Sequence, residues 1–138
     1  MHKNSFVLDV NIWISLFLKN EYKNLTKWIT KEDVVLYCSD TMTTELISVI
    51  HREHIVKFLK LPPYEYIKFY NQITTSFKNT PVFTGCSDQD DNYLFDLAEQ
   101  SGANYLVSGD KKVLATKTNF PINIITLSEF KQIIYEHI

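Results

Sequence analysis

Acidic side chains recur where apolar segments of this sequence end. Asp9 follows the apolar run 5–8, and Asp110 follows the run 103–108. Four further carboxylates fall within the stretch 88–96. Carboxylate oxygens are the ligands that Mg²⁺ and Mn²⁺ prefer, whereas Zn²⁺ favours histidine and cysteine. We therefore infer a divalent-metal site whose ligands come from separate parts of the chain.

Helical spacing indicates which of the remaining carboxylates face inward. Glu45 lies three residues after Met42 and four before Val49, so it shares their apolar stripe. Burying an unpaired carboxylate costs several kcal/mol, so such a group is neutralised, paired or bound to metal. At about 100° per residue, Asp91 falls on the apolar side of the helix that follows it. By the same spacing Asp96 points away and is expected to be solvated.

Each of these acids also has a simpler structural explanation. Asp9 suits the cap of a helix or a turn, and Glu45 suits a pair with a lysine or a hydroxyl. Acids at a helix start interact favourably with the helix dipole, by a few tenths to about 1 kcal/mol. Asp88 and Asp90 are therefore expected to cap the helix or to make a looser contribution to the metal site. The choice between Asp90 and Asp91 as the third ligand stays open.

Alternating strand and helix patterns would bring these acids together. Short apolar runs predict strands at 5–8, 34–38, 81–83, 103–108 and 122–125. Apolar spacing and capping residues predict intervening helices, of which the first begins at Ile12 with Asn11 as its cap and others span 22–30, 42–50, 64–78, 88–102 and 127–135. This alternation indicates one α/β domain over residues 1–138 with a mostly parallel sheet. Ligands bind at the carboxyl edge of such sheets, where Asp9 and Asp110 converge.

Composition fits one globular domain and limits the kinds of partner. The 138 residues are 45% hydrophobic and 14% aromatic, and a chain of this size buries roughly 70% of its unfolded surface. The net charge of −2 gives no overall basic surface, so any nucleic-acid contact must use local patches. Lysines at 19, 23, 27 and 31 recur near one helix face, as either a solvated face or a phosphate-contacting stripe.

The chain carries no sequence signal for export or membrane insertion. Its start lacks the pattern of a signal peptide, and no apolar run approaches the ~20 residues of a membrane span. Cys38 and Cys86 match no metal-binding spacing and are expected to be reduced thiols. We expect a cytoplasmic protein.

Four motifs together resemble those of PIN domains. They are Val7-Leu8-Asp9-Val10-Asn11, Thr44-Glu45-Leu46, Asp88-Gln89-Asp90-Asp91-Asn92 and Tyr105-Leu106-Val107-Ser108-Gly109-Asp110-Lys111. They occur in the family's order over nearly the whole chain, and the chain is most similar to VapC-like toxins of bacterial type II toxin–antitoxin systems. The resemblance implies a three-layer α/β/α fold and an Mg²⁺- or Mn²⁺-dependent endoribonuclease that hydrolyses RNA phosphodiester bonds. It also implies a homodimer and a cognate antitoxin protein that blocks the site.

The resemblance further implies roles for individual residues. The metal-holding and catalytic carboxylates would be Asp9, Glu45, Asp91 and Asp110. Accessory acids and polar supports would be Asp88, Asp90, Asn11 and Ser108. Lysines expected to contact the RNA backbone are Lys111, Lys112, Lys19 and Lys23.

Two other functions are compatible with parts of the pattern. In a Mg²⁺-dependent phosphotransfer or phosphatase domain, Asp9 would be the phosphorylated nucleophile. That chemistry needs a second acid near Asp9, yet position 11 is asparagine. A degenerate PIN-like module would bind RNA or protein without catalysis, and the full set of four acids counts against it. A third alternative keeps the nuclease activity and places it in RNA processing, without an antitoxin.

Overall fold

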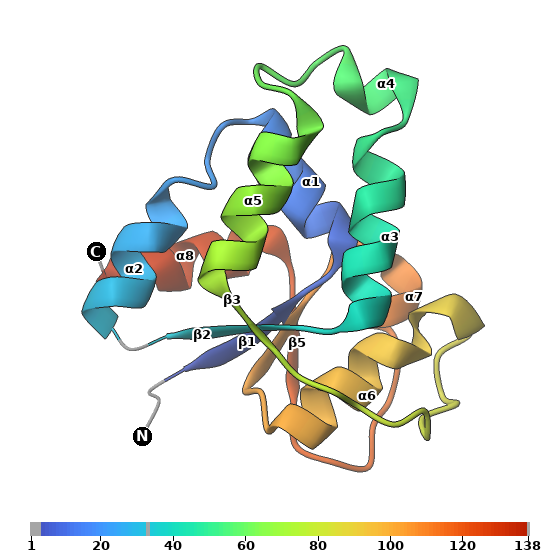
Figure 1. Ribbon diagram of the computed structural model, residues 1–138. Coiled ribbons are helices and arrows are strands. Elements are labelled where there is room, and N and C mark those ends of the chain that lie inside the picture. Colours follow the sequence, from blue (N-terminus) through green and yellow to red (C-terminus); the bar gives the residue numbers. More distant parts are fainter. Residues whose placement is uncertain (1–3, 33, 138) are drawn as a thin grey trace.

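A parallel five-stranded sheet forms the centre of the molecule (Figure 1). The computed structural model describes residues 4–32 and 34–137, but not the side chains of residues 28, 31, 32 and 134–137. The strands are β1 (Ser5–Leu8), β2 (Val35–Cys38), β3 (Thr74–Ser76), β4 (Tyr105–Val107) and β5 (Asn123–Ile125). They are ordered β3-β2-β1-β4-β5, and every neighbouring pair is parallel.

Helices cover both faces of this sheet. They are α1 (Val10–Leu18), α2 (Asn24–Glu32), α3 (Asp40–Ile50), α4 (Glu53–Val56), α5 (Pro63–Ile73), α6 (Asn92–Ser101), α7 (Lys111–Leu114) and α8 (Leu127–His137). A 3₁₀ turn, η1 (Gln89–Asp91), leads into α6. Helices α1, α3 and α5 lie on one face and α6 lies on the other, packed on β1, β2 and β4 (Figure 1). The predicted three-layer α/β/α architecture is therefore confirmed.

Strand β1 and helix α1 are largely buried because their sequences are mostly apolar. All four residues of β1 are buried, as expected of a central parallel strand covered on both faces. Most of α1 is buried as well, and Trp13 packs edge-on against Tyr70 of α5 with 5.0 Å between ring centroids. A helix that is apolar all round belongs in the core. The core thus fixes the direction in which β1 ends.

The strand order places a crevice beyond the carboxyl ends of β1 and β4. The chain runs from β1 outward through β2 to β3 and then returns to the other side of β1 as β4. The amino ends of β1 and β4 are joined, because the Ser5 backbone N–H donates to Asn104 Oδ1 at 2.9 Å. The stacked rings of Phe6 and Tyr105, 4.8 Å apart, add a contact beside that bond. The opposite ends are where an α/β sheet of this type binds ligands.

Two predicted elements differ from the structure. One is the end of the helix that became α5, and the other is the strand predicted between α5 and α6. The helix predicted for 64–78 ends at Ile73, because residues 74–76 leave it to pair with β2 as β3. The strand predicted for 81–83 is absent, because its backbone N–H groups bond to a side chain instead of a neighbouring strand. The short helices α4 and α7 were not predicted.

The predicted cap of the first helix is also wrong. Helix α1 begins at Val10 instead of Ile12, and Asp9 occupies the N-cap position. Asn11 is consequently an exposed residue within the first turn.

Among the described residues, no helix is both long and apolar enough to cross a membrane.

Candidate functional site

Asp9 lies at the carboxyl end of β1, where it is held by a serine from β4. Its side chain is 4% exposed, and its Oδ2 accepts a hydrogen bond of 2.8 Å from Ser108 Oγ. The same hydroxyl oxygen accepts from the Asp110 backbone N–H at 3.0 Å. Asp9 makes no side-chain capping bond to α1, so its carboxylate is oriented by Ser108 rather than used as a cap.

Burial and neighbouring acids make the charged form of Asp9 costly. Burial raises the pKa of Asp9, the hydrogen bond from Ser108 lowers it, and the negative charges of Glu45 and Asp110 raise it again, to a net value above the ordinary one. The groups that raise the pKa of Asp9 come from α3 and from the loop after β4. The carboxylates predicted from separate segments therefore lie in electrostatic range of one another.

Three further carboxylates form a cluster beside Asp9. Each of Asp88, Asp91 and Asp110 offers one oxygen, and these oxygens lie within 4.8 Å of one another. Local bonds orient two of them: Asp88 Oδ1 accepts from the Asp90 N–H at 3.1 Å, and Asp110 Oδ1 accepts from the Lys112 N–H at 2.9 Å. These two acids cap η1 and α7 respectively.

Asp91 is the member whose titration is most affected. Burial raises its pKa to about 7, and the charges on four other acids add to the effect. Those acids are Asp9, Asp88, Asp110 and Glu45. Burial is the main cause of this shift, and the negative charge concentrated at this edge of the sheet adds to it.

Glu45 is oriented by a tyrosine that the sequence did not single out. Tyr93 of α6 donates its hydroxyl to Glu45 Oε2 at 2.8 Å. Burial and the adjacent Glu45 charge raise the pKa of the Tyr93 phenol far above its ordinary value, so it stays protonated and donates. Forty-eight residues separate the two positions, and nothing in the local spacing of either links them.

The arrangement fits a hard divalent cation. The cluster presents oxygen ligands only, which suit Mg²⁺ or Mn²⁺. The raised pKa values of Asp9 and Asp91 show mutual repulsion that a bound cation would remove. The residues that would hold it are the cluster Asp88, Asp91 and Asp110 together with Asp9, and Glu45 lies beside them.

The structure separates the remaining acids of the stretch 88–96. Asp90 is exposed and lies outside the cluster, so Asp91 is the residue brought to Asp88 and Asp110. The prediction that Asp96 is solvated is wrong: it is 3% exposed, and its carboxylate accepts from the N–H groups of Val82 at 3.2 Å and Phe83 at 2.8 Å. Helical phase gave its side of α6 correctly, but the segment 81–83 covers that side.

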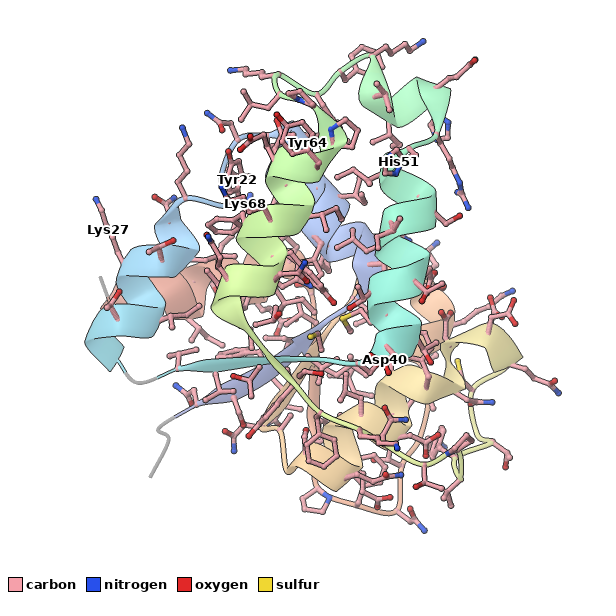
Figure 2. The ribbon with its side chains drawn as sticks, viewed as in Figure 1. Tyr22, Lys27, Asp40, His51, Tyr64 and Lys68 are labelled. Atoms are coloured by element: carbon pink, nitrogen blue, oxygen red, sulfur yellow. The ribbon has the colours of Figure 1, made fainter. Side chains whose placement is uncertain are left out.

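Asn11, predicted as a polar support, and the lysines predicted to contact RNA lie in different parts of the structure. The side chain of Asn11 is exposed on α1 and makes no hydrogen bond within the part of the chain that the structure describes. Exposed lysines flank Asp110 on α7 and fill the α1–α2 connection, at Lys111, Lys112, Lys19 and Lys23. Figure 2 shows Lys27, on α2, at the far side of the molecule from Asp40, which marks the start of α3. Lys31 lies outside the side chains described.

Two clefts meet beside the carboxylates. One, of about 570 Å³, runs between the start of α3 and the segment 77–84. The other, of about 630 Å³, extends along α3 from Glu45 to Arg52. Four residues line both: Asp40, Thr41, Asp90 and Tyr93. Glu45 lines the second cleft, so the two clefts together offer an extended groove that reaches this carboxylate.

Comparison with known proteins agrees with this geometry. No curated protein matches the sequence. The fold is similar to the crystal structure of PAE2754 from Pyrobaculum aerophilum, with a TM-score of 0.63, 16% identity, and coverage of 96% of this chain and 90% of that one. That likeness concerns the fold alone. The family model of the PIN domain matches residues 5–112, a span that contains all four principal carboxylates and most of the chain. The chain therefore belongs to the PIN domain family.

Proposed function

We propose that this chain is a divalent-metal-dependent endoribonuclease that hydrolyses RNA phosphodiester bonds as the toxin of a toxin–antitoxin system. PIN domains are typically metal-dependent nucleases. One observation carries the proposal: oxygens of Asp88, Asp91 and Asp110 lie within 4.8 Å of one another at the crevice beyond β1 and β4, and Asp9 and Glu45 lie in electrostatic range of them. A site built for a neutral small molecule would not concentrate repelling carboxylates in this way.

The chain's own residues prepare this site in three ways. The cluster Asp88, Asp91 and Asp110, together with Asp9, would hold Mg²⁺ or Mn²⁺, which when bound neutralises phosphate charge and activates water for attack. Ser108 fixes Asp9 and the Asp110 backbone in one network. Tyr93 fixes Glu45, and the open clefts on either side admit a polynucleotide strand.

The proposed partners follow from the same reading. RNA is the substrate, and a cognate antitoxin that covers the carboxylate site would prevent cleavage. A homodimer is supported by large apolar side chains exposed around α4: Val56, Phe58, Leu61 and Tyr64. Isolated exposed apolar residues are common, whereas a group of them within nine residues of chain is typical of an interaction surface.

The first test is cleavage of single-stranded RNA by the purified chain in Mg²⁺, Mn²⁺ or EDTA. We expect cleavage with either metal and none in EDTA. Asp110→Asn should lower the rate by at least about a hundredfold, because it removes a charged ligand. The matched control is Glu99→Gln, which neutralises an exposed acid near the end of α6. Cleavage that is indifferent to EDTA, or unchanged in Asp110→Asn, contradicts the proposal.

Calorimetric titration with Mn²⁺ separates the nuclease from a non-catalytic binding module. The nuclease requires Mn²⁺ binding that Asp110→Asn weakens and Glu99→Gln leaves intact. RNA binding without any Mn²⁺ binding would favour the module.

A further inference from the structure

The cleft between α3 and the segment 77–84 contains the groups that recognise a nucleobase. Its volume is about 570 Å³, and its walls include aromatic rings and side-chain amides, among them Phe77, Phe83, Asn79 and Asn92. Aromatic side chains stack on bases, and amides hydrogen-bond to base edges. Asp40, which Figure 2 shows at the start of α3, lines both this cleft and the second one.

The outer wall of the cleft is held in place although it is not a strand. The buried Asp96 carboxylate accepts from the Val82 and Phe83 backbones. Gln100 binds Thr80 reciprocally, accepting from its N–H at 2.8 Å and donating to its carbonyl at 2.7 Å. These bonds tie the segment to α6 from two positions. A wall fixed before binding loses little conformational entropy when a ligand enters.

The aromatic side chain at the centre of this wall is also fixed. The Phe83 ring stacks on Phe95 of α6, with centroids 4.7 Å apart and ring planes 22° from parallel. Phe95 is fully buried, so Phe83 rests on the core while still lining the cleft. The Phe83 ring is therefore packed on Phe95 and also lines the cleft, where a ligand can reach it.

The charges around the cleft select which part of a nucleotide enters it. Asp40 and Asp90 line it, and negative charge there opposes a phosphate inside. Lys78 is the cation at this cleft, is exposed, and has no ion-pair partner among the described residues. A neutral base suits the interior, and a neighbouring phosphate suits Lys78.

The cleft is continuous with the carboxylate site through Tyr93. This residue lines both clefts, and its hydroxyl is bonded to Glu45. A base against the Phe83 wall would therefore belong to a nucleotide close to the one whose phosphate reaches the carboxylates.

We propose that this cleft binds one nucleoside of the substrate strand beside the cleaved phosphate, with Lys78 on an adjoining phosphate. The inference rests on the proposed ribonuclease function and adds to it a binding site for a base next to the carboxylates. Phe83 and Lys78 are the specificity residues, and Asp96 is the residue that positions their segment.

Fluorescence anisotropy of a fluorescein-labelled single-stranded RNA octamer tests this directly. The titrations use the full chain carrying Asp9→Asn, with Mg²⁺ present and the probe checked for integrity on a gel. Phe83→Leu should weaken binding about tenfold, because a base loses its stacking partner. Lys78→Ala should weaken binding and flatten its salt dependence, because a phosphate contact is lost.

Matched controls come from the same segment and from a distant helix. Val82→Ala alters an exposed neighbour that does not line this cleft, and Lys68→Ala removes an exposed lysine on α5, far from Asp40 in Figure 2. Both should stay within about twofold of the parent. A melting curve of each variant confirms that the fold is kept, and Lys78→Ala keeps the test decisive if Phe83→Leu does not fold.

An abasic octamer separates base recognition from phosphate binding. On that probe Phe83→Leu should bind as the parent does, while Lys78→Ala should still bind more weakly. Equal affinity of Phe83→Leu and parent for the normal octamer overturns the inference, even if the wild-type chain cleaves RNA. A Phe83 effect that depends on the base, in a chain that cleaves no RNA, supports the cleft and overturns the proposed function instead.

Discussion

The Tyr93 hydroxyl directs Glu45 through a single hydrogen bond of 2.8 Å. We predict that Tyr93→Phe weakens Mn²⁺ binding and slows RNA cleavage, each by about tenfold, because groups that orient a ligand carboxylate contribute on that scale. Calorimetry and single-turnover cleavage measure the two effects. Tyr105→Phe removes the same atom from the opposite end of the sheet and should change neither. Unaltered Mn²⁺ affinity in Tyr93→Phe would show that Glu45 needs no such support.

Asp91 makes the stability of the metal-free chain depend on pH. Its pKa rises from 3.8 in an ordinary carboxyl to about 7 in the fold, so folding favours the protonated form. That stabilisation is complete below about pH 3.8 and is lost as the pH rises through about 7. In EDTA, the melting temperature should therefore fall between pH 5 and pH 8.

The Asp91→Asn variant tests the source of this dependence. Without a titrating group at this position, the fall in melting temperature between pH 5 and pH 8 should be smaller, and the variant should exceed the parent at pH 8. A parent chain whose melting temperature is flat over that range would contradict the pKa assigned to Asp91.

The sequence was informative about residues wherever burial and chemistry agreed. Asp9 and Asp110 were identifiable because each directly follows a buried strand, and parallel strands end at one edge. Helical phase favoured Asp91 over Asp90 but left the choice open, and the cluster in the structure contains Asp91. Tyr93 could not be found this way, because a tyrosine in an amphipathic helix is ordinary and its partner lies 48 residues away. Asp96 was misjudged because a helix has a second side that a distant loop can cover.

At the scale of elements, α6 joins the two halves of the site. Its first turn carries Tyr93 toward Glu45, and Asp96, three residues further along the same helix face, accepts from the backbone of the segment 81–83. One helix therefore orients a candidate metal ligand and also fixes the wall of the adjoining cleft.

Asp96→Ala should loosen the segment 77–84 and destabilise the fold. The change leaves the backbone N–H groups of Val82 and Phe83 without their charged acceptor, at a cost of about 2–3 kcal/mol. Urea unfolding followed by circular dichroism measures this loss. Asp90→Ala, an exposed acid two turns away, should cost less than about 0.5 kcal/mol. Equal stability of the two variants would show that these hydrogen bonds are dispensable.

Elements were predictable from sequence in proportion to their burial. Strands β1 and β2 read as apolar runs because both faces are covered. Strand β3, Thr74-Thr75-Ser76, is a half-exposed edge strand whose residues are polar, so only its pairing with β2 defines it. The segment Pro81-Val82-Phe83 is apolar and looked like a strand, yet its backbone is satisfied by Asp96. The local sequence does not indicate that residues 74–76 pair with β2, or that residues 81–83 bond to Asp96.

For the whole molecule, the apolar residues around α4 are expected to form the contact between two copies. Phe58 is 66% exposed and Tyr64 is 64% exposed, on the chain between α3 and the start of α5. Phe58→Asp should convert a dimer into a monomer, because it places a charge in a buried apolar contact. Light scattering after size-exclusion chromatography measures the mass. Val82→Asp, equally exposed but next to the nucleotide cleft, should leave the mass unchanged.

The hydrogen bond between Ser108 and Asp9 spans 99 positions of sequence. A ribosome adding about 5–20 residues per second makes Asp9 on the order of 10 s before Asp110. During that interval the emerging chain has its first acid and no partner for it. If the chain is a ribonuclease, it therefore cannot cut the message from which it is being translated before Asp110 has been added.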